Sequence, residues 1–113
     1  MEITVSLIDE IPVFHLAGRL DVTTAPLLEE RLKPLLESTG QKILFACSEL
    51  SYVSSAGLRV FISTLRHLSA GGGGIAFAEL KPPVTELFHL AGLGHLFLIE
   101  PNLEAAAARL RSS

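Results

Sequence analysis

Short apolar runs alternate with helical patterns along the chain, and this alternation most constrains the fold. Five runs predict strands, at residues 3–8, 11–17, 43–47, 75–78 and 96–99. A polar turn at Asp9 and Glu10 joins the first two runs into a hairpin, after which residues 18–21 are expected to leave the sheet. The predicted order is β-β-α-β-α-β-α-β-α. Strands that alternate with helices predict an α/β domain with a mostly parallel central sheet.

Four segments carry apolar side chains at helical spacing. The first has Thr23 or Thr24 as a candidate cap, the third opens at Pro82 and the fourth follows Asn102. The second follows Ser55, and its expected inward face is Leu58, Phe61, Ile62, Leu65 and Leu68. Helices on both faces of the sheet account for the 49% hydrophobic content of the chain.

Length and composition exclude several classes of protein. A chain of 113 residues fits a single domain over residues 1–113. No apolar run approaches the roughly 20 residues that span a bilayer, and no basic segment follows Met1, so we expect a cytoplasmic location. A net charge of -3 argues against nucleic-acid binding. Cys47 is the single cysteine, so no internal disulfide and no zinc-type cysteine cluster is expected.

The most informative segment is residues 50–59, where a strand turns tightly into the second helix. Free backbone N–H groups and the helix dipole favour an anion at such a start, so a phosphate on Ser55 would lie close to them. The alternative is that Ser54 or Ser55 only caps the helix. Val53 occupies the position where a hydrolase nucleophile elbow needs glycine, which argues against a serine hydrolase.

Asp21 and Arg59 are the two charged candidates near these serines. Asp21 follows a neighbouring strand, and the carboxyl ends of parallel strands are where α/β sheets gather their sites. It can equally be a solvated turn residue or a cap for the first helix. Arg59 lies one turn into the second helix, where it can contact a partner or a phosphate, or simply be solvated.

Three features together resemble the STAS family, which comprises bacterial anti-sigma factor antagonists and their relatives. The first is Gly18-Arg19-Leu20-Asp21, with Thr23 and Thr24 at the start of the first helix. The second is the segment 50–59, which is similar to the family's aspartate-serine-serine/alanine-glycine-leucine signature. The third is the glycine-rich return at residues 71–74 into a strand. The resemblance covers almost the whole chain.

The resemblance implies a phosphorylation-gated binding protein without catalytic activity, cofactor or metal. The unmodified protein would bind an anti-sigma factor that is also a serine kinase, and phosphorylation on Ser55 would release it. A serine phosphatase would restore the unmodified form. The residues implied in partner binding are Asp21, Thr23, Ser54, Ser55, Gly57 and Arg59.

The chain departs from the family pattern at two positions. Ser54 stands where the signature has aspartate, and Ala46 replaces an acidic residue usual at the end of the third strand. Ser54 is therefore a second candidate phosphoacceptor. These departures also leave open a different role, that of a constitutive STAS subunit in an ABC lipid-transport complex, where the same surface would dock on an ATPase.

Overall fold

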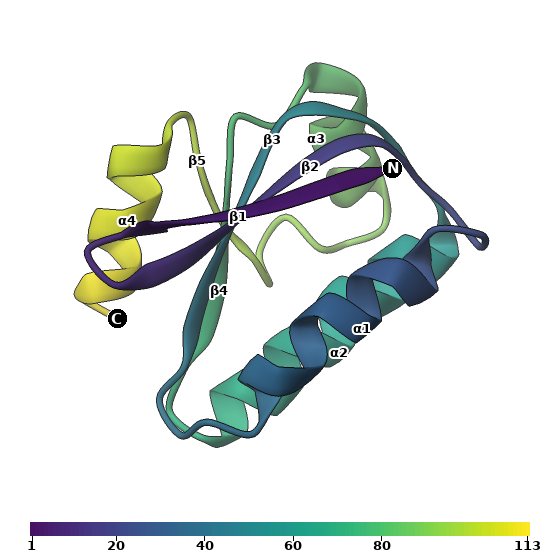
Figure 1. Ribbon diagram of the computed structural model, residues 1–113. Helices are drawn as coiled ribbons and strands as arrows, with labels where there is room; N and C mark the ends of the chain where they lie inside the picture. Colours follow the sequence, from purple (N-terminus) through teal and green to yellow (C-terminus); the bar gives the residue numbers. More distant parts are fainter.

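A five-stranded mixed sheet forms the centre of the protein in the computed structural model, which describes residues 1–113 (Figure 1). The strands are β1 (Glu2–Ile8), β2 (Ile11–Leu20), β3 (Lys42–Val53), β4 (Gly74–Ala78) and β5 (Leu98–Glu100). The helices are α1 (Ala25–Leu36), α2 (Ser55–Ala70), α3 (Pro82–Leu90) and α4 (Leu103–Arg111). β1 pairs antiparallel with β2, and the other three pairings are parallel. The predicted element order and mostly parallel sheet are confirmed.

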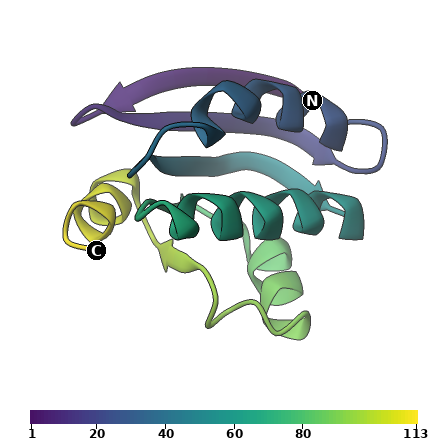
Figure 2. The same ribbon diagram turned by 90° about the horizontal axis from the view of Figure 1, so that it is seen from below.

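Helices cover both faces of the sheet, unequally. α1 and α2 lie side by side on one face, with α3 beyond them, and α4 lies on the other (Figures 1 and 2). A cluster of 20 buried residues fills the first side, and a cluster of nine fills the side under α4. None of the four helices is long and apolar enough to cross a bilayer.

Buried aromatic rings fix the position of α2 on the sheet. The ring centroid of Phe61 lies 5.0 Å from that of Phe45 on β3 and 4.9 Å from that of Phe77 on β4. Phe88 of α3 packs against Phe77 at 5.2 Å. All four side chains are fully buried. Because interiors are close-packed, these contacts hold α2 in place over β3 and β4.

Three strand boundaries differ from those predicted. β2 continues to Leu20 instead of leaving the sheet at residue 18, with Gly18 at φ +103° beside a register shift in the pairing with β3. β5 is displaced to residues 98–100. β3 runs to Val53 because its polar second half still pairs with β2, although Ser48, Glu49, Ser51 and Tyr52 are exposed.

The longer β3 also relocates one of the family positions. Ala46 lies in the middle of β3, where it pairs with Ala78 of β4, and not at the end of the strand as expected. Its side chain is buried in the cluster under α4. The position is therefore separated from the start of α2 by the second half of β3.

The glycine-rich segment at residues 71–74 passes against the residues that precede β3. A side chain on Gly73 would lie 1.8 Å from the Gln41 carbonyl oxygen, so no other residue fits there without backbone movement. The Gly40 N–H donates to the Gly71 carbonyl at 2.9 Å. This contact ties the end of α2 to the start of β3.

Candidate functional site

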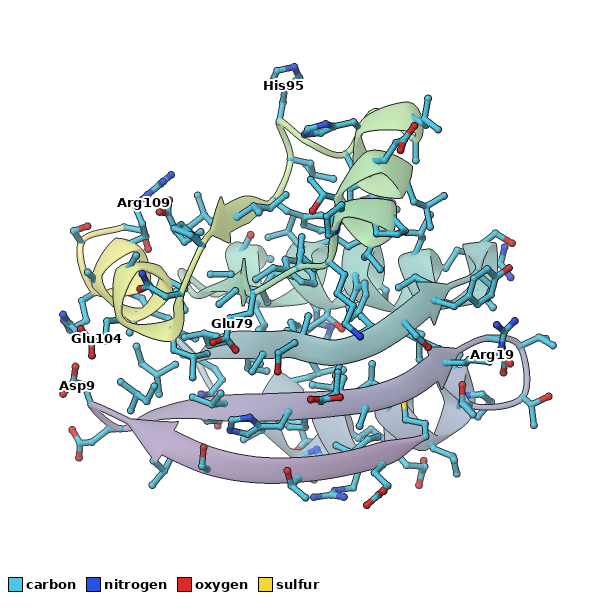
Figure 3. The ribbon with its side chains drawn as sticks, turned by 90° about the horizontal axis from the view of Figure 1, so that it is seen from above. Asp9, Arg19, Glu79, His95, Glu104 and Arg109 are labelled. Atoms are coloured by element: carbon cyan, nitrogen blue, oxygen red, sulfur yellow. The ribbon has the colours of Figure 1, made fainter.

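The ends of β2 and β3 lie next to each other, and each leads into a helix. Leu20 pairs with Val53, and the Ser54 N–H donates to the Leu20 carbonyl at 2.8 Å. Asp21 and Ser54 therefore leave the sheet from adjoining positions, α1 and α2 starting at the same end (Figure 1). Figure 3 labels Arg19 at this end, with Asp9 of the β1–β2 turn at the other. Asp21 and Ser55 thus follow the adjoining ends of β2 and β3, as expected. Thr23 and Ser54 are next to them in the chain, and Arg59 lies one turn into α2.

Ser54 uses its side chain to cap α2. Its backbone is extended (φ -87°, ψ 175°), and its Oγ accepts a hydrogen bond from the Gly57 N–H at 3.4 Å. Serine and aspartate are both strongly preferred at this position, because either side chain offers an oxygen to the first turn. The capping alternative considered for the two serines thus applies to Ser54.

Ser55 is the first residue of α2, and it is exposed. The first bond within the helix runs from the Leu58 N–H to the Ser54 carbonyl at 2.9 Å, so the N–H groups of Ser55 and Ala56 precede it. A group attached to the Ser55 hydroxyl would face the positive end of the helix dipole. The hydroxyl is accessible to a modifying enzyme.

Gly57 allows α2 to approach the strand ends closely. A Cβ at this residue would lie 2.7 Å from Leu20 Cγ and 3.0 Å from Val53 Cγ1. Gly57 is buried, so it contributes to this site by close packing of α2 against the strand ends.

The Asp21 carboxylate organises the turn between β2 and α1. Its Oδ1 accepts hydrogen bonds from the Thr23 N–H at 3.0 Å and the Thr24 N–H at 3.1 Å. The Thr24 bond is the main reason why the pKa of Asp21 is lowered. Thr24 occupies the N-cap position of α1, as predicted for one of the two threonines, but its side chain makes no capping hydrogen bond to the helix. Its Oγ1 instead accepts from the Asp21 N–H and donates to the Arg19 carbonyl, while Asp21 binds the N–H groups just before the helix.

Aromatic and apolar groups that sequence reasoning missed flank this turn. The Arg19 guanidinium lies over the Tyr52 ring, 4.1 Å from its centroid. Arg19 Nε also lies 3.9 Å from Asp21 Oδ2. Val22 at the tip of the turn is 75% exposed. The sequence signal for this cluster was Tyr52, an aromatic residue two positions before Ser54. It lies in the second half of β3, where most side chains are exposed.

A hollow lies between the first turns of α1 and α2, beside the serines. Its volume is about 390 Å³, and it is lined by Val22, Ala25, Pro26, Glu29, Ala56, Arg59, Val60 and Ser63. Arg59 is exposed on its rim. Thr23 is exposed as well and contributes its backbone N–H to Asp21. The site thus combines an exposed hydroxyl, a carboxylate, a guanidinium and a small apolar depression.

Other potentially reactive groups lie outside this site. Cys47 is fully buried within β3, and burial raises the pKa of its thiol far above the ordinary value. No group of three or more His, Cys, Asp or Glu side chains is placed to hold a metal ion.

Comparisons with known proteins identify the family of the chain. The model of the STAS domain matches residues 2–106. BtrV, a candidate anti-sigma factor antagonist of Bordetella bronchiseptica, is 31% identical over 113 residues, which cover 100% of this chain and 97% of that protein. The anti-sigma-B factor antagonist of Bacillus subtilis is 33% identical over 90 residues, covering 80% of this chain and 82% of that protein.

Solved structures share the fold at lower identity. An anti-sigma factor antagonist from Mycobacterium paratuberculosis superposes with a TM-score of 0.86 at 24% identity, over 97% of this chain and 93% of that one. The anti-sigma factor antagonist SpoIIAA in its unphosphorylated form superposes with a TM-score of 0.82 at 21% identity, over 99% of this chain and 98% of that one. SpoIIAA from Bacillus in its phosphorylated form superposes with a TM-score of 0.73 at 21% identity, over 97% of this chain and 100% of that one. With the family model matching nearly the whole length, the chain belongs to the STAS domain family.

Proposed function

We propose that this protein is an anti-sigma factor antagonist whose binding is controlled by phosphorylation of Ser55. The unmodified protein binds an anti-sigma factor that is also a serine kinase. The kinase transfers the γ-phosphoryl group of ATP to the Ser55 Oγ, releasing ADP and the hydroxyl proton, and the complex dissociates. A serine phosphatase hydrolyses the phosphoserine and restores binding.

The observation that carries this proposal is the placement of Ser55. Its exposed hydroxyl lies at the start of α2, beside the Asp21 turn, while the neighbouring Ser54 is occupied as the cap. Relatives named as anti-sigma factor antagonists support the antagonist role. SpoIIAA, a protein with the same fold, has been solved in a phosphorylated form.

Electrostatics supply a reason for release. A phosphoserine adds a charge of about -1.5 to -2 at neutral pH, on a protein whose net charge is -3. The added charge lies near Asp21, so like charges gather where a partner must fit closely. A partner that contacts the free hydroxyl also loses a hydrogen-bond partner and meets a larger group.

The proposal is tested with the protein and the kinase from the same organism. A Ser55→Ala variant is used to co-purify the anti-sigma factor, which is identified by mass spectrometry and then purified. Incubation of that kinase with wild-type protein and ATP is followed by intact mass. We expect one phosphoryl group on wild type and on Ser54→Ala, none on Ser55→Ala, and loss of the complex with the phosphorylated protein.

The controls separate the alternatives that the sequence leaves open. Phosphorylation of Ser55→Ala but not of Ser54→Ala would assign the acceptor to Ser54. Co-purification of a transporter ATPase and permease with Ser55→Ala, in place of a kinase, would favour the transport-complex role. Wild-type protein that binds the kinase but takes no phosphoryl group would contradict the switch.

A further inference from the structure

Helix α2 carries a cationic stripe on its exposed side. Its sequence contains Arg59, Arg66 and His67 and no acidic residue, although the protein as a whole has a net charge of -3. Arg59 and Arg66 are seven residues apart, which is about two turns, so both project from the same side of the helix. Both residues are exposed. We call Arg59, Ser63, Arg66 and His67 the α2 stripe.

The two arginines of the stripe are not neutralised within the molecule. The ion pairs of the protein engage the cations Arg19, Lys33, Arg109 and Arg111. The arginine side chains that donate hydrogen bonds are those of Arg31, Arg109 and Arg111. Arg59 and Arg66 are in neither set, so their guanidinium groups remain available to an external anion.

The stripe borders a continuous depression that starts beside Ser55. Arg59 and Ser63 line the hollow between α1 and α2 described above. The same two residues also line a shallower hollow that extends along α2 to Ile62, Arg66 and His67. The shared lining makes the two hollows parts of one surface. The part beside Ser55 contains the apolar side chains of Val22 and Pro26 and the carboxylate of Glu29 on α1. The part that extends along α2 contains Arg66 and has no acidic residue in its lining.

We propose that this depression receives an acidic segment of the anti-sigma factor, with Arg59 and Arg66 as the two cations that bind it. The proposal rests on the proposed function, and it names the chemistry of the partner at that site. Arginine suits this role because its planar guanidinium binds a carboxylate through two parallel hydrogen bonds. Charge complementarity is the reason for choosing an acidic segment, because α2 has two cations without an ion pair and no carboxylate of its own. Glu29 of α1 lines the hollow beside Ser55 but forms no ion pair with Arg59, and the hollow around Arg66 has no acidic lining residue.

The same geometry couples the stripe to the switch. Ser55 and Arg59 are four residues apart on one helix, and residues at this spacing are neighbours on a helix surface, so a phosphate on Ser55 would be within reach of the Arg59 side chain. A phosphate on Ser55 therefore competes with the acidic segment for Arg59. Phosphorylation would then weaken binding in two ways, by repelling the segment and by occupying one of its two cations.

The test measures affinity by calorimetry between the purified anti-sigma factor and Ser55→Ala protein, in which the switch cannot act. Arg66→Glu is the informative variant, because Arg66 lies three turns from the phosphorylation site and outside the first hollow. Lys81→Glu is the matched control, with the same change of charge at an exposed position before α3. We expect Arg66→Glu to weaken binding about tenfold and to reduce its salt dependence, and Lys81→Glu to change it by less than about threefold.

The outcomes separate this inference from the function on which it rests. Unchanged affinity in both Arg59→Glu and Arg66→Glu, with binding still abolished by Ser55→Asp, would overturn the acidic-segment proposal and leave the antagonist role intact. Equal losses in Arg66→Glu and Lys81→Glu would also overturn it, because the effect would then be one of net charge. Absence of any complex with Ser55→Ala protein would overturn both proposals. Thermal melting of each variant confirms that it is folded.

Discussion

The Ser54 N–H donates to the Leu20 carbonyl at 2.8 Å, and this bond joins the ends of two parallel strands that each turn into a helix. It sets the Asp21 turn and the first turn of α2 beside each other, although no side-chain hydrogen bond or ion pair joins the two turns. The relative position of Asp21 and Ser55 therefore depends on backbone packing. Substitutions that disturb this packing should act on stability first and on binding through it.

Gly57→Ala tests that dependence. The added methyl group would overlap Leu20 and Val53, at 2.7 Å and 3.0 Å from their side-chain atoms. Overpacking of this kind costs about 1–3 kcal/mol of unfolding free energy, measured by urea denaturation. Gly74→Ala is the control, because a Cβ there meets nothing within 4 Å. Equal stability of the two variants would show that the strand ends can move away from α2.

Asp21→Asn separates the charge of this residue from its shape. The pKa of Asp21 is lowered, first by the Thr24 N–H, so the carboxylate stabilises the folded state above its unfolded pKa of about 3.9. That stability is lost as the pH falls through the lower, folded value. Urea denaturation at several pH values should show wild type more stable than Asp21→Asn at pH 7, with the difference shrinking below about pH 4. A difference that persists in full at pH 2 would contradict the electrostatic origin.

Phe61→Ala tests how α2 is held on the sheet. Phe61 contacts the rings of Phe45 and Phe77 and is fully buried, so truncation should cost about 3–5 kcal/mol of unfolding free energy. Partner binding should fall only in proportion to the unfolded fraction, as measured at several temperatures. Leu90→Ala is the control, because Leu90 is 79% exposed and its loss should change stability by less than about 0.5 kcal/mol.

The order of elements could be predicted from the sequence because buried strands and amphipathic helices leave distinct periodic patterns. The second half of β3 could not. Within residues 48–52 only Leu50 is buried, on the side of α1 and α2, and the polar side chains of the others look like those of a loop. The turn at Asp21 was ambiguous for a different reason. Aspartate and threonine both cap helices, and only the structure shows that Asp21 accepts the N–H bonds while the Thr24 hydroxyl donates to the Arg19 carbonyl.

Ser54→Asp restores the aspartate of the family signature, and its stability shows how serine and aspartate differ as the cap of α2. The Ser54 Oγ accepts one hydrogen bond from Gly57 at 3.4 Å, which is long, so Ser54→Ala should cost no more than the low end of the 0.5–2 kcal/mol typical of caps. An aspartate keeps the cap and adds a negative charge at the positive end of the helix, worth about 0.3–1 kcal/mol. Ser54→Asp should therefore be at least as stable as wild type.

The same variant distinguishes a structural aspartate from one that the kinase uses. If the signature aspartate serves only as a cap, Ser54→Ala should be phosphorylated on Ser55 nearly as fast as wild type, and Ser54→Asp no faster. If the kinase needs a carboxylate beside the acceptor hydroxyl, Ser54→Asp should raise the initial rate severalfold, as followed by intact mass. Because Ser54 already fills the cap geometry, we expect Ser54→Asp to raise the rate without shifting the melting temperature downward. An unchanged rate in Ser54→Asp would contradict this and assign the signature aspartate to the cap alone. A lower rate would also contradict it, and would show that the added charge hinders transfer to Ser55.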